Sequence, residues 1–176
     1  MTVFVISDLH LGHRGVLTFE HDDEPLRPFT RLHEMHQYIT ERWCAVVTPS
    51  DKVYVLGDVA MAKSVKNLIA GLPGVKRLVK GNHDHFSDNW YHEAGFQRIY
   101  GVRQINGVWL THVPMHPCSM DRAIGNIHGH MHANEVMTYG KGPNMRPDLR
   151  YFNCSVERVN YTPVSIDAIT NERKWR

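Results

Sequence analysis

The strongest constraint on the fold of this chain is a series of short apolar runs, each followed at once by polar side chains. The runs are TVFVIS (2–7), KVYVLG (52–57) and VKRLVKG (75–81). Runs of this length, rich in β-branched residues, predict buried strands. The polar side chains therefore lie at strand ends, and open α/β sheets bind ligands beyond the carboxyl ends of their strands.

Helical segments separate these runs. Ser64 is expected to cap a short helix through Ile69, which Gly71 and Pro73 end. An earlier helix is predicted over 29–47, because its apolar side chains recur at spacings of three and four along one face: Phe29, Leu32, Met35, Ile39, Trp43 and Val46. The order strand, helix, strand, helix, strand favours a parallel sheet with right-handed crossovers.

The second half of the chain has a different pattern. Asn106-Gly107 separates two strand-like runs, 96–105 and 108–113, and predicts a hairpin because Asn-Gly suits a tight turn. Residues 133–149 are rich in Gly, Pro, Asn and Met and predict a loop. Further strand-like runs are Ile124–His128, Arg150–Val156 and Pro163–Ile166.

Length and composition indicate one soluble globular domain over residues 1–176. The net charge of +2 gives no strong electrostatic footprint for nucleic acid. Histidine is unusually frequent, with 13 copies, and it is the commonest metal ligand.

Three cysteines, Cys44, Cys118 and Cys154, have no spacing typical of a disulfide framework or a zinc ribbon. Free thiols fit a reducing cytoplasm. The first apolar run breaks at Asp8 and is too short for a signal peptide or a membrane span. We therefore expect a cytoplasmic protein that does not associate with membranes.

Five segments bring donor groups to the predicted sheet edge, and their seven candidate metal ligands are Asp8, His10, Asp58, Asn82, His112, His130 and His132. Alternate residues of an extended chain point the same way, so Asp8 and His10, or His130 and His132, could reach one ion together. Glycines at 57, 81 and 129 would let the backbone approach closely.

The donor set is made of carboxylates, imidazoles and one amide oxygen, without thiolate. This set suits manganese, iron or zinc. Seven ligands are too many for one ion and suit two ions that share a bridging carboxylate. Two such ions can clamp a phosphate ester and activate a bridging hydroxide for in-line attack.

The remaining polar residues of GNHD (81–84) have candidate catalytic roles. His83 could donate to the phosphoryl oxygen or protonate the leaving alkoxide. Asp84 could orient the His83 imidazole, or it could cap the next helix. Outside the motifs, His13, Arg14 and His116 are candidate substrate contacts, and each could equally be a solvated surface residue.

Taken in order, these motifs resemble those of the calcineurin-like metallophosphoesterases: D-x-H (8–10), G-D (57–58), G-N-H-D (81–84), T-H (111–112) and G-H-x-H (129–132). The resemblance covers residues 2–132. It implies a four-layer α/β/β/α sandwich of two mixed sheets flanked by helices, and His83 as the acid-like group. It also implies one metal bound by Asp8, His10, Asp58 and His132, and a second bound by Asp58, Asn82, His112 and His130.

Two departures from the family's protein phosphatases concern specificity. Those enzymes carry an Arg shortly after Gly-Asp and read G-N-H-E, whereas this chain has GDVAMAK and GNHD. The departures resemble the phosphodiesterase and nucleotidase side of the family. The late element Asn153-Cys154-Ser155-Val156 resembles the compact bacterial and phage-type enzymes.

The sequence thus predicts a dinuclear metal-dependent phosphoesterase, with manganese favoured and iron, zinc or nickel as alternatives. A nucleotide-type phosphodiester is the favoured substrate, and nucleic acid is expected only as a substrate. A general phosphomonoesterase or protein phosphatase, a non-catalytic metal-binding scaffold and a nucleic-acid-binding module are the alternatives. The oligomeric state stays open.

Overall fold

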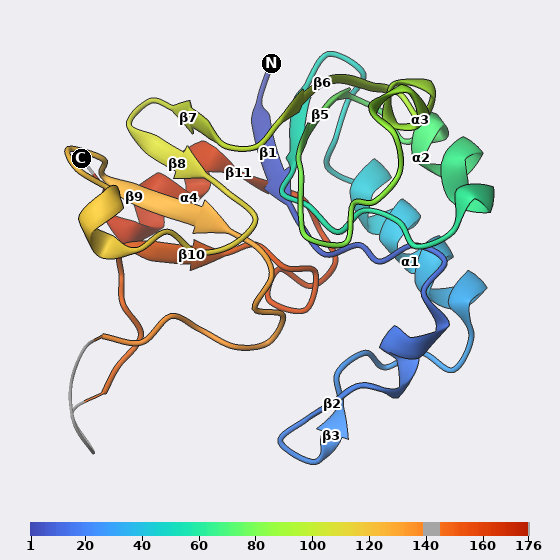
Figure 1. Cartoon of the computed structure of the whole chain (residues 1–176), viewed down its shortest axis with the longest axis horizontal. Coiled ribbons are helices and arrows are strands. Elements are labelled where there is room, and N and C mark those ends of the chain that lie inside the picture. Colours follow the sequence, from blue (N-terminus) through green and yellow to red (C-terminus); the bar gives the residue numbers. More distant parts are fainter. Residues whose placement is uncertain (139–144, 176) are drawn as a thin grey trace.

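The architecture is a pair of sheets stacked face to face with helices on the outside (Figure 1). The computed structural model describes residues 1–138 and 145–175. The first sheet has the strand order β11-β1-β4-β5-β6, and the second has the order β10-β9-β8-β7. Both sheets are mixed, and the arrangement confirms the predicted fold class.

The first sheet holds the three predicted apolar strands. Its members are β1 (Val3–Ile6), β4 (Lys52–Val55), β5 (Val75–Val79), β6 (Phe96–Tyr100) and β11 (Val164–Ser165). The first four are parallel, and β11 is antiparallel to β1. One face packs on three helices: α1 (Leu32–Cys44), α2 (Lys66–Gly71) and α3 (Asp88–Glu93). The predicted α1 face is confirmed at Met35, Ile39 and Trp43, which are buried.

The second sheet covers the other face of the first. Its members are β7 (Arg103–Ile105), β8 (Val108–Leu110), β9 (Gly125–His128) and β10 (Tyr151–Asn153). Leu110 and Ile127 share a core with Val5 and Tyr54 of the first sheet. A helix that the sequence patterns did not predict, α4 (Ile166–Arg173), closes this core beside β1 and β11.

Two expectations about local structure are wrong. Residues 96–105 do not form one strand, because β6 pairs with β5 and ends at Tyr100, and the chain then crosses to the other sheet. The Asn106-Gly107 turn therefore joins β7 to β8, with both residues at positive φ. Ser64 lies inside a 3-10 turn, η2 (Lys63–Val65), and makes no capping hydrogen bond.

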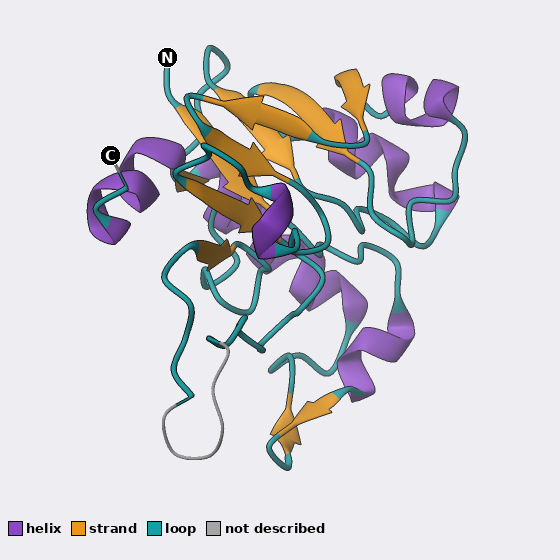
Figure 2. Cartoon of the chain, turned by 60° about the vertical axis from the view of Figure 1, so that its left-hand side comes forward, coloured by secondary structure: helices purple, strands orange, loops and turns teal. Residues whose placement is uncertain are grey.

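Smaller elements complete the fold. They are η1 (Arg14–Thr18), η3 (Pro117–Ser119), and the short hairpin of β2 (Glu20–His21) and β3 (Glu24–Pro25). We call residues 19–26 the arm. The arm and the segment after β9 extend on the same side of the body (Figures 1 and 2).

The predicted loop at 133–149 is confirmed for its described part, apart from one bridge between Met137 and Pro147; residues 139–144 lie outside the described residues. None of the helices in the described parts of the chain has the length and apolar character needed to cross a bilayer.

Candidate metal centre

The predicted ligands meet beyond the carboxyl ends of β1, β4, β5, β8 and β9. Donor atoms of Asp8, His10 and His132 lie within 4.8 Å of one another, and so do those of Asp8, Asp58 and His112. The remaining two predicted ligands, Asn82 and His130, adjoin the second group. Asn82 Oδ1 lies 2.8 Å from His112 Nε2 and 3.0 Å from His130 Nδ1.

Asp58 lies between the two groups. Its Oδ2 is 3.6 Å from His10 Nε2, and its Oδ1 is 3.4 Å from His112 Nε2. The two oxygens therefore face different halves of the cluster, as a bridging carboxylate requires. Asp8 also belongs to both groups, so two carboxylates rather than one connect the halves.

The backbone that presents these residues is not extended. Asp8, His10 and Asp58 have φ of 59°, 48° and 53°, and His130 and His132 have φ of 69° and 49°. The prediction that these pairs point the same way because they alternate along an extended strand is therefore wrong. The strands end before them, β1 at Ile6 and β9 at His128. Left-handed non-glycine residues are costly and concentrate at functional sites.

Glycine is required where the loops approach one another. A Cβ on Gly129 would lie 2.4 Å from Ser7 Oγ and 2.5 Å from Asp8 Oδ2. A Cβ on Gly57 would meet His112 Nδ1 at 2.5 Å, and this residue also has φ of +89°. The third predicted position, Gly81, approaches Asp58 in the same way. The predicted close approach is confirmed at all three.

The centre contains buried polar atoms without partners. Asp8 is fully buried; its Oδ2 accepts hydrogen bonds from Ser155 Oγ and His130 N, both at 2.9 Å, but its Oδ1 accepts none from the described residues. Neither ring nitrogen of the buried His10 makes a hydrogen bond within the same part of the chain. Orphaned groups of this kind are rare in native proteins, and a carboxylate oxygen beside an imidazole nitrogen is a donor pair that fits a divalent cation.

Burial also sets the protonation of these groups. It raises the pKa of Asp8 and lowers the pKa of His10 to about 2, with Arg27 adding to the second effect. His10 is therefore neutral and able to ligate. A bound cation would favour the charged form of Asp8.

Hydrogen bonds on the far side of two rings select their tautomers. His112 Nδ1 donates to the Leu56 carbonyl at 2.8 Å, which leaves the Nε2 lone pair facing Asp58 and Asn82. His132 Nδ1 lies 3.0 Å from Glu157 Oε1. Burial lowers the pKa of His132, but the Glu157 carboxylate outweighs it and the net shift is upward. Carboxylate and carbonyl partners of this kind are usual behind metal-binding imidazoles.

The sequence model that describes calcineurin-like phosphoesterases matches residues 1–159. The chain belongs to this family. The family and the candidate ligand groups together support metal-dependent phosphoester hydrolysis.

Relatives in other organisms are similar over different lengths. Uncharacterized protein MJ1445 of Methanocaldococcus jannaschii is 32% identical over 173 residues, covering 95% of this chain and 88% of that protein. The gene 66 protein of Mycobacterium phage L5 is 32% identical over 85 residues, covering 44% of this chain and 37% of that protein. A solved protein of unknown function, AQ665 from Aquifex aeolicus, superposes with a TM-score of 0.68 over 97% of this chain and 98% of its own, at 24% identity. The last likeness shows the fold alone.

Two residues that the motifs did not reveal support the first ligand group of this family member. Arg27 is 1% exposed and donates from Nε and Nη2 to Glu157 Oε1 at 2.8 and 2.7 Å. It also donates to the backbone carbonyls of Asp8 and Leu9. Glu157 directly follows Asn153-Cys154-Ser155-Val156, and this position was the available signal. Arg27 stands in no motif.

Asp84 has a different role from the predicted one. Its carboxylate accepts hydrogen bonds from the backbone amides of Asp58, Val59 and Gly81 and from the Tyr91 hydroxyl. These four donors occupy both oxygens, so Asp84 holds the loops after β4 and β5 together. The predicted orientation of His83 by Asp84 is not what the structure shows. Burial raises the pKa of Asp84, and the backbone donors oppose that shift.

His83 and His13 flank the open side of the centre. The His83 backbone amide donates to Asp58 Oδ1 at 2.9 Å, while its ring is exposed, with its centroid 5.9 Å from that of His10. The centroids of the His13 and His10 rings lie 5.5 Å apart. Burial lowers the pKa of His13. Both imidazoles are thus placed to face a substrate.

The other two predicted substrate contacts are not brought to the centre. Arg14 is exposed and lines a separate hollow with Leu17, Thr30 and Arg31. His116 caps η3, where its Nδ1 accepts from Cys118 N at 3.3 Å. The hollows that Arg14 and His116 line contain none of the seven candidate ligands.

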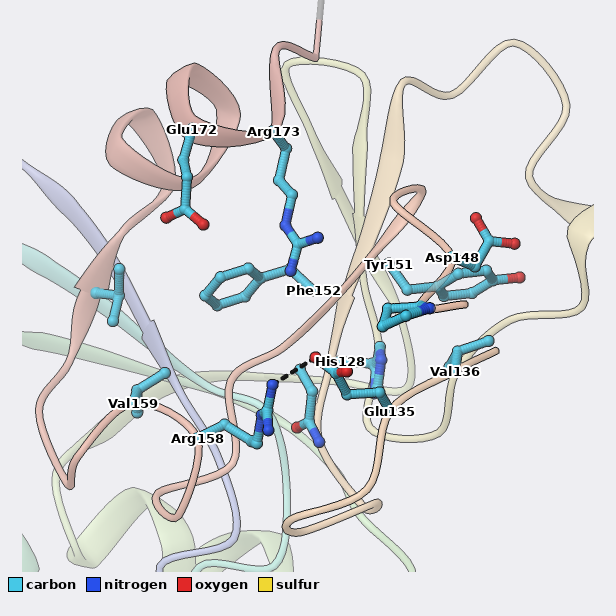
Figure 3. A pocket seen from close by; sticks show the side chains of 13 residues that line it. His128, Glu135, Val136, Asp148, Tyr151, Phe152, Arg158, Val159, Glu172 and Arg173 are labelled. Atoms are coloured by element: carbon cyan, nitrogen blue, oxygen red, sulfur yellow. Dashed lines mark hydrogen bonds and ion pairs between the residues drawn. The ribbon is translucent and has the colours of Figure 1, made fainter. Parts of the chain in front are cut away.

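Behind β9 and β10 lies a separate cavity of about 300 Å³ (Figure 3). His128 is fully buried there, with Nδ1 bound to the Gly129 carbonyl and burial lowering its pKa to about 4. Asn153, which also lines this cavity, donates to the carbonyls of His132 and Asn134 at 2.8 Å. The cavity wall therefore also fixes the loop that carries His130 and His132.

Proposed function

We propose that this chain is a dinuclear metal-dependent phosphodiesterase that acts on a nucleotide-type substrate. The observation that supports this most is the buried cluster itself, in which Asp8 Oδ1 and both nitrogens of His10 have no partner among the described residues. Manganese is the favoured metal, with iron, zinc or nickel as alternatives. We also propose a cytoplasmic location, from the three unpaired thiols.

The donors divide into two proposed sites. One is formed by Asp8, His10, Asp58 and His132, and the other by Asp58, Asn82, His112 and His130. When bound, two divalent cations supply Lewis acidity that polarises the phosphoryl group and lowers the pKa of the attacking water. The protein holds the ligands rigidly through Arg27, Glu157 and Asp84, so little reorganisation accompanies the reaction.

His83 is the proposed acid for the leaving alkoxide. Its backbone amide donates to Asp58, and its exposed ring makes no hydrogen bond in the described residues, so the ring can reach a leaving oxygen. The alkoxide that leaves from a nucleotide diester is a poor leaving group, and its departure benefits from such a proton donor. The segment after Asp58, VAMAK (59–63), contains no Arg of the kind that the family's protein phosphatases carry shortly after Gly-Asp.

The test compares two chromogenic esters after metal exchange. The protein is stripped of metal and reloaded with manganese, and the hydrolysis of bis(p-nitrophenyl) phosphate is followed beside that of p-nitrophenyl phosphate. We expect a manganese-restored rate that is higher for the diester. Hydrolysis of the monoester alone would reject the diester preference and indicate a phosphatase. Two bound metals with no rate on either ester would favour the scaffold alternative.

A further inference from the structure

A groove of about 690 Å³ opens beside the candidate metal centre. The arm lines the groove with Phe19 and His21, and Val113 and Met131 contribute from other segments. His130 and His132 also line it, so the groove reaches two proposed metal ligands. A volume of this size fits a small organic group.

Ring contacts also connect the arm wall to the centre. Phe19 packs edge-on against His13 with ring centroids 5.6 Å apart, and His13 lies 5.5 Å from His10. One imidazole thus separates Phe19 from a proposed ligand. A phosphate held at the centre would have its substituent directed along this row of rings.

The walls are apolar but exposed. Phe19 is 42% exposed and Val113 is 50% exposed, although both are large apolar residues. Neighbouring apolar side chains left open in a groove mark a binding surface more often than scattered ones do. A flat ring bound in the groove would cover both side chains and could stack on Phe19.

Polar atoms stand at the edge of the same groove. His21 Nε2 lies 3.2 Å from Asn134 Oδ1, and this contact links the arm to the loop after His132. Glu135 also lines the groove, but its carboxylate accepts a hydrogen bond from Arg158, and both residues line the neighbouring cavity (Figure 3). Within the described residues the Asn134 Nδ2 amide makes no hydrogen bond, so a ring with polar edges can accept one from it, whereas an alkyl chain cannot.

We propose that this groove holds the nucleobase of the substrate and that Phe19 is the residue that recognises it by stacking. The inference rests on the proposed function, because it assumes a phosphate at the metal centre. It adds the position of the base, the wall that contacts it and the role of the arm. Stacking on Phe19 tolerates any base, so the preference is for a nucleoside rather than for one sequence.

The test uses two competitors that differ only in the base. Thymidine 5′-monophosphate and 2-deoxyribose 5-phosphate are added to the hydrolysis of whichever chromogenic ester the manganese enzyme cleaves, and their inhibition constants are compared. We expect the nucleotide to bind about five- to a hundredfold more tightly, the range that base–aromatic stacking supplies. Calorimetric titration of the same pair gives the ratio without turnover.

Variants then locate the effect. Phe19→Ala should reduce the ratio of the two constants to near one and leave the constant for the sugar phosphate unchanged, while Phe19→Trp should keep the ratio. Val102→Ala, at a 47% exposed position outside the groove, is the matched control and should keep it too.

Two results would overturn the inference. One is equal binding of the two competitors to the wild-type protein, and the other is a ratio that survives in Phe19→Ala. Neither depends on whether the enzyme prefers diesters, so the base site and the proposed reaction can fail separately.

Discussion

Buried carboxylates at the two ends of the five-stranded sheet differ in their hydrogen bonding and in the direction of their pKa shift. At the amino end, Asp51 accepts hydrogen bonds from Thr2 N, Thr48 N and the Thr48 hydroxyl, and these donors lower its pKa to about 2. At the carboxyl end, Asp8 keeps one oxygen without a partner, and burial raises its pKa.

The difference separates a carboxylate that stabilises the fold, Asp51, from one that is available to bind a ligand, Asp8. A satisfied carboxylate lowers the free energy of the native state. An unsatisfied one is costly, and the surrounding structure must compensate for it. The following substitutions test whether each end behaves as this contrast requires.

Asp58→Asn should have the largest effect. It removes the charge that faces both halves of the centre, so occupancy of both metals should fall and the rate should drop to near background. Metal content by elemental analysis and the rate on the diester measure this. Asp88→Asn, at a 65% exposed side chain paired with Lys80, is the control and should retain metal and rate.

His83→Ala should slow turnover by roughly 10²–10⁴-fold, as for a lost acid–base group. Both metals should stay bound, because only the backbone of His83 contacts Asp58. The rate, on a diester with an alkyl leaving group, and the metal content are measured on the same sample, because a p-nitrophenolate leaving group needs little protonation. Loss of metal in this variant would show that the imidazole is a ligand and that the assigned role is wrong.

Glu157→Gln should weaken metal binding by about 10–100-fold, the usual cost of losing the partner behind a metal-binding histidine. It should also destabilise the metal-free protein, since Arg27 would remain buried without its counter-charge. Metal titration and thermal unfolding follow the two effects. Glu172→Gln changes an exposed carboxylate and should alter neither; if both variants behave alike, Glu157 has no special role.

Asp51→Asn should have the smallest effect, confined to stability. A carboxylate with a lowered pKa contributes stability above its ordinary pKa of 3.8, and loses it as the pH falls toward about 2. The variant should therefore be less stable than wild type at pH 7, and the gap should narrow below about pH 4. Denaturant unfolding across this range gives the gap, and a constant gap would contradict the assignment.

The sequence was sufficient for the parts of the centre that follow directly from strand ends. The apolar runs predicted the parallel strands β1, β4 and β5, and the residues just after them are among those that meet. Close approach at Gly57 and Gly129 was also predictable, because no side chain fits there.

Contacts between distant segments could not be predicted. Nothing near Arg27 indicates that it will meet Glu157, since the pair forms only when the segments after β3 and β10 pack together. Asp84 was predicted to orient His83 because the two residues are adjacent in sequence. Its carboxylate instead accepts hydrogen bonds from backbone amides of the loops around residues 58 and 81. The left-handed conformation of Asp8 and His10 likewise follows from tertiary packing rather than from local preference.

The hydrogen bond between Ser155 and Asp8 joins residues 147 positions apart. Asp8 leaves the ribosome well before Ser155. During synthesis, therefore, Asp8 lacks this hydrogen bond until the later segment has been made. The pocket around Asp8 is completed only when the residues around Ser155 pack against it.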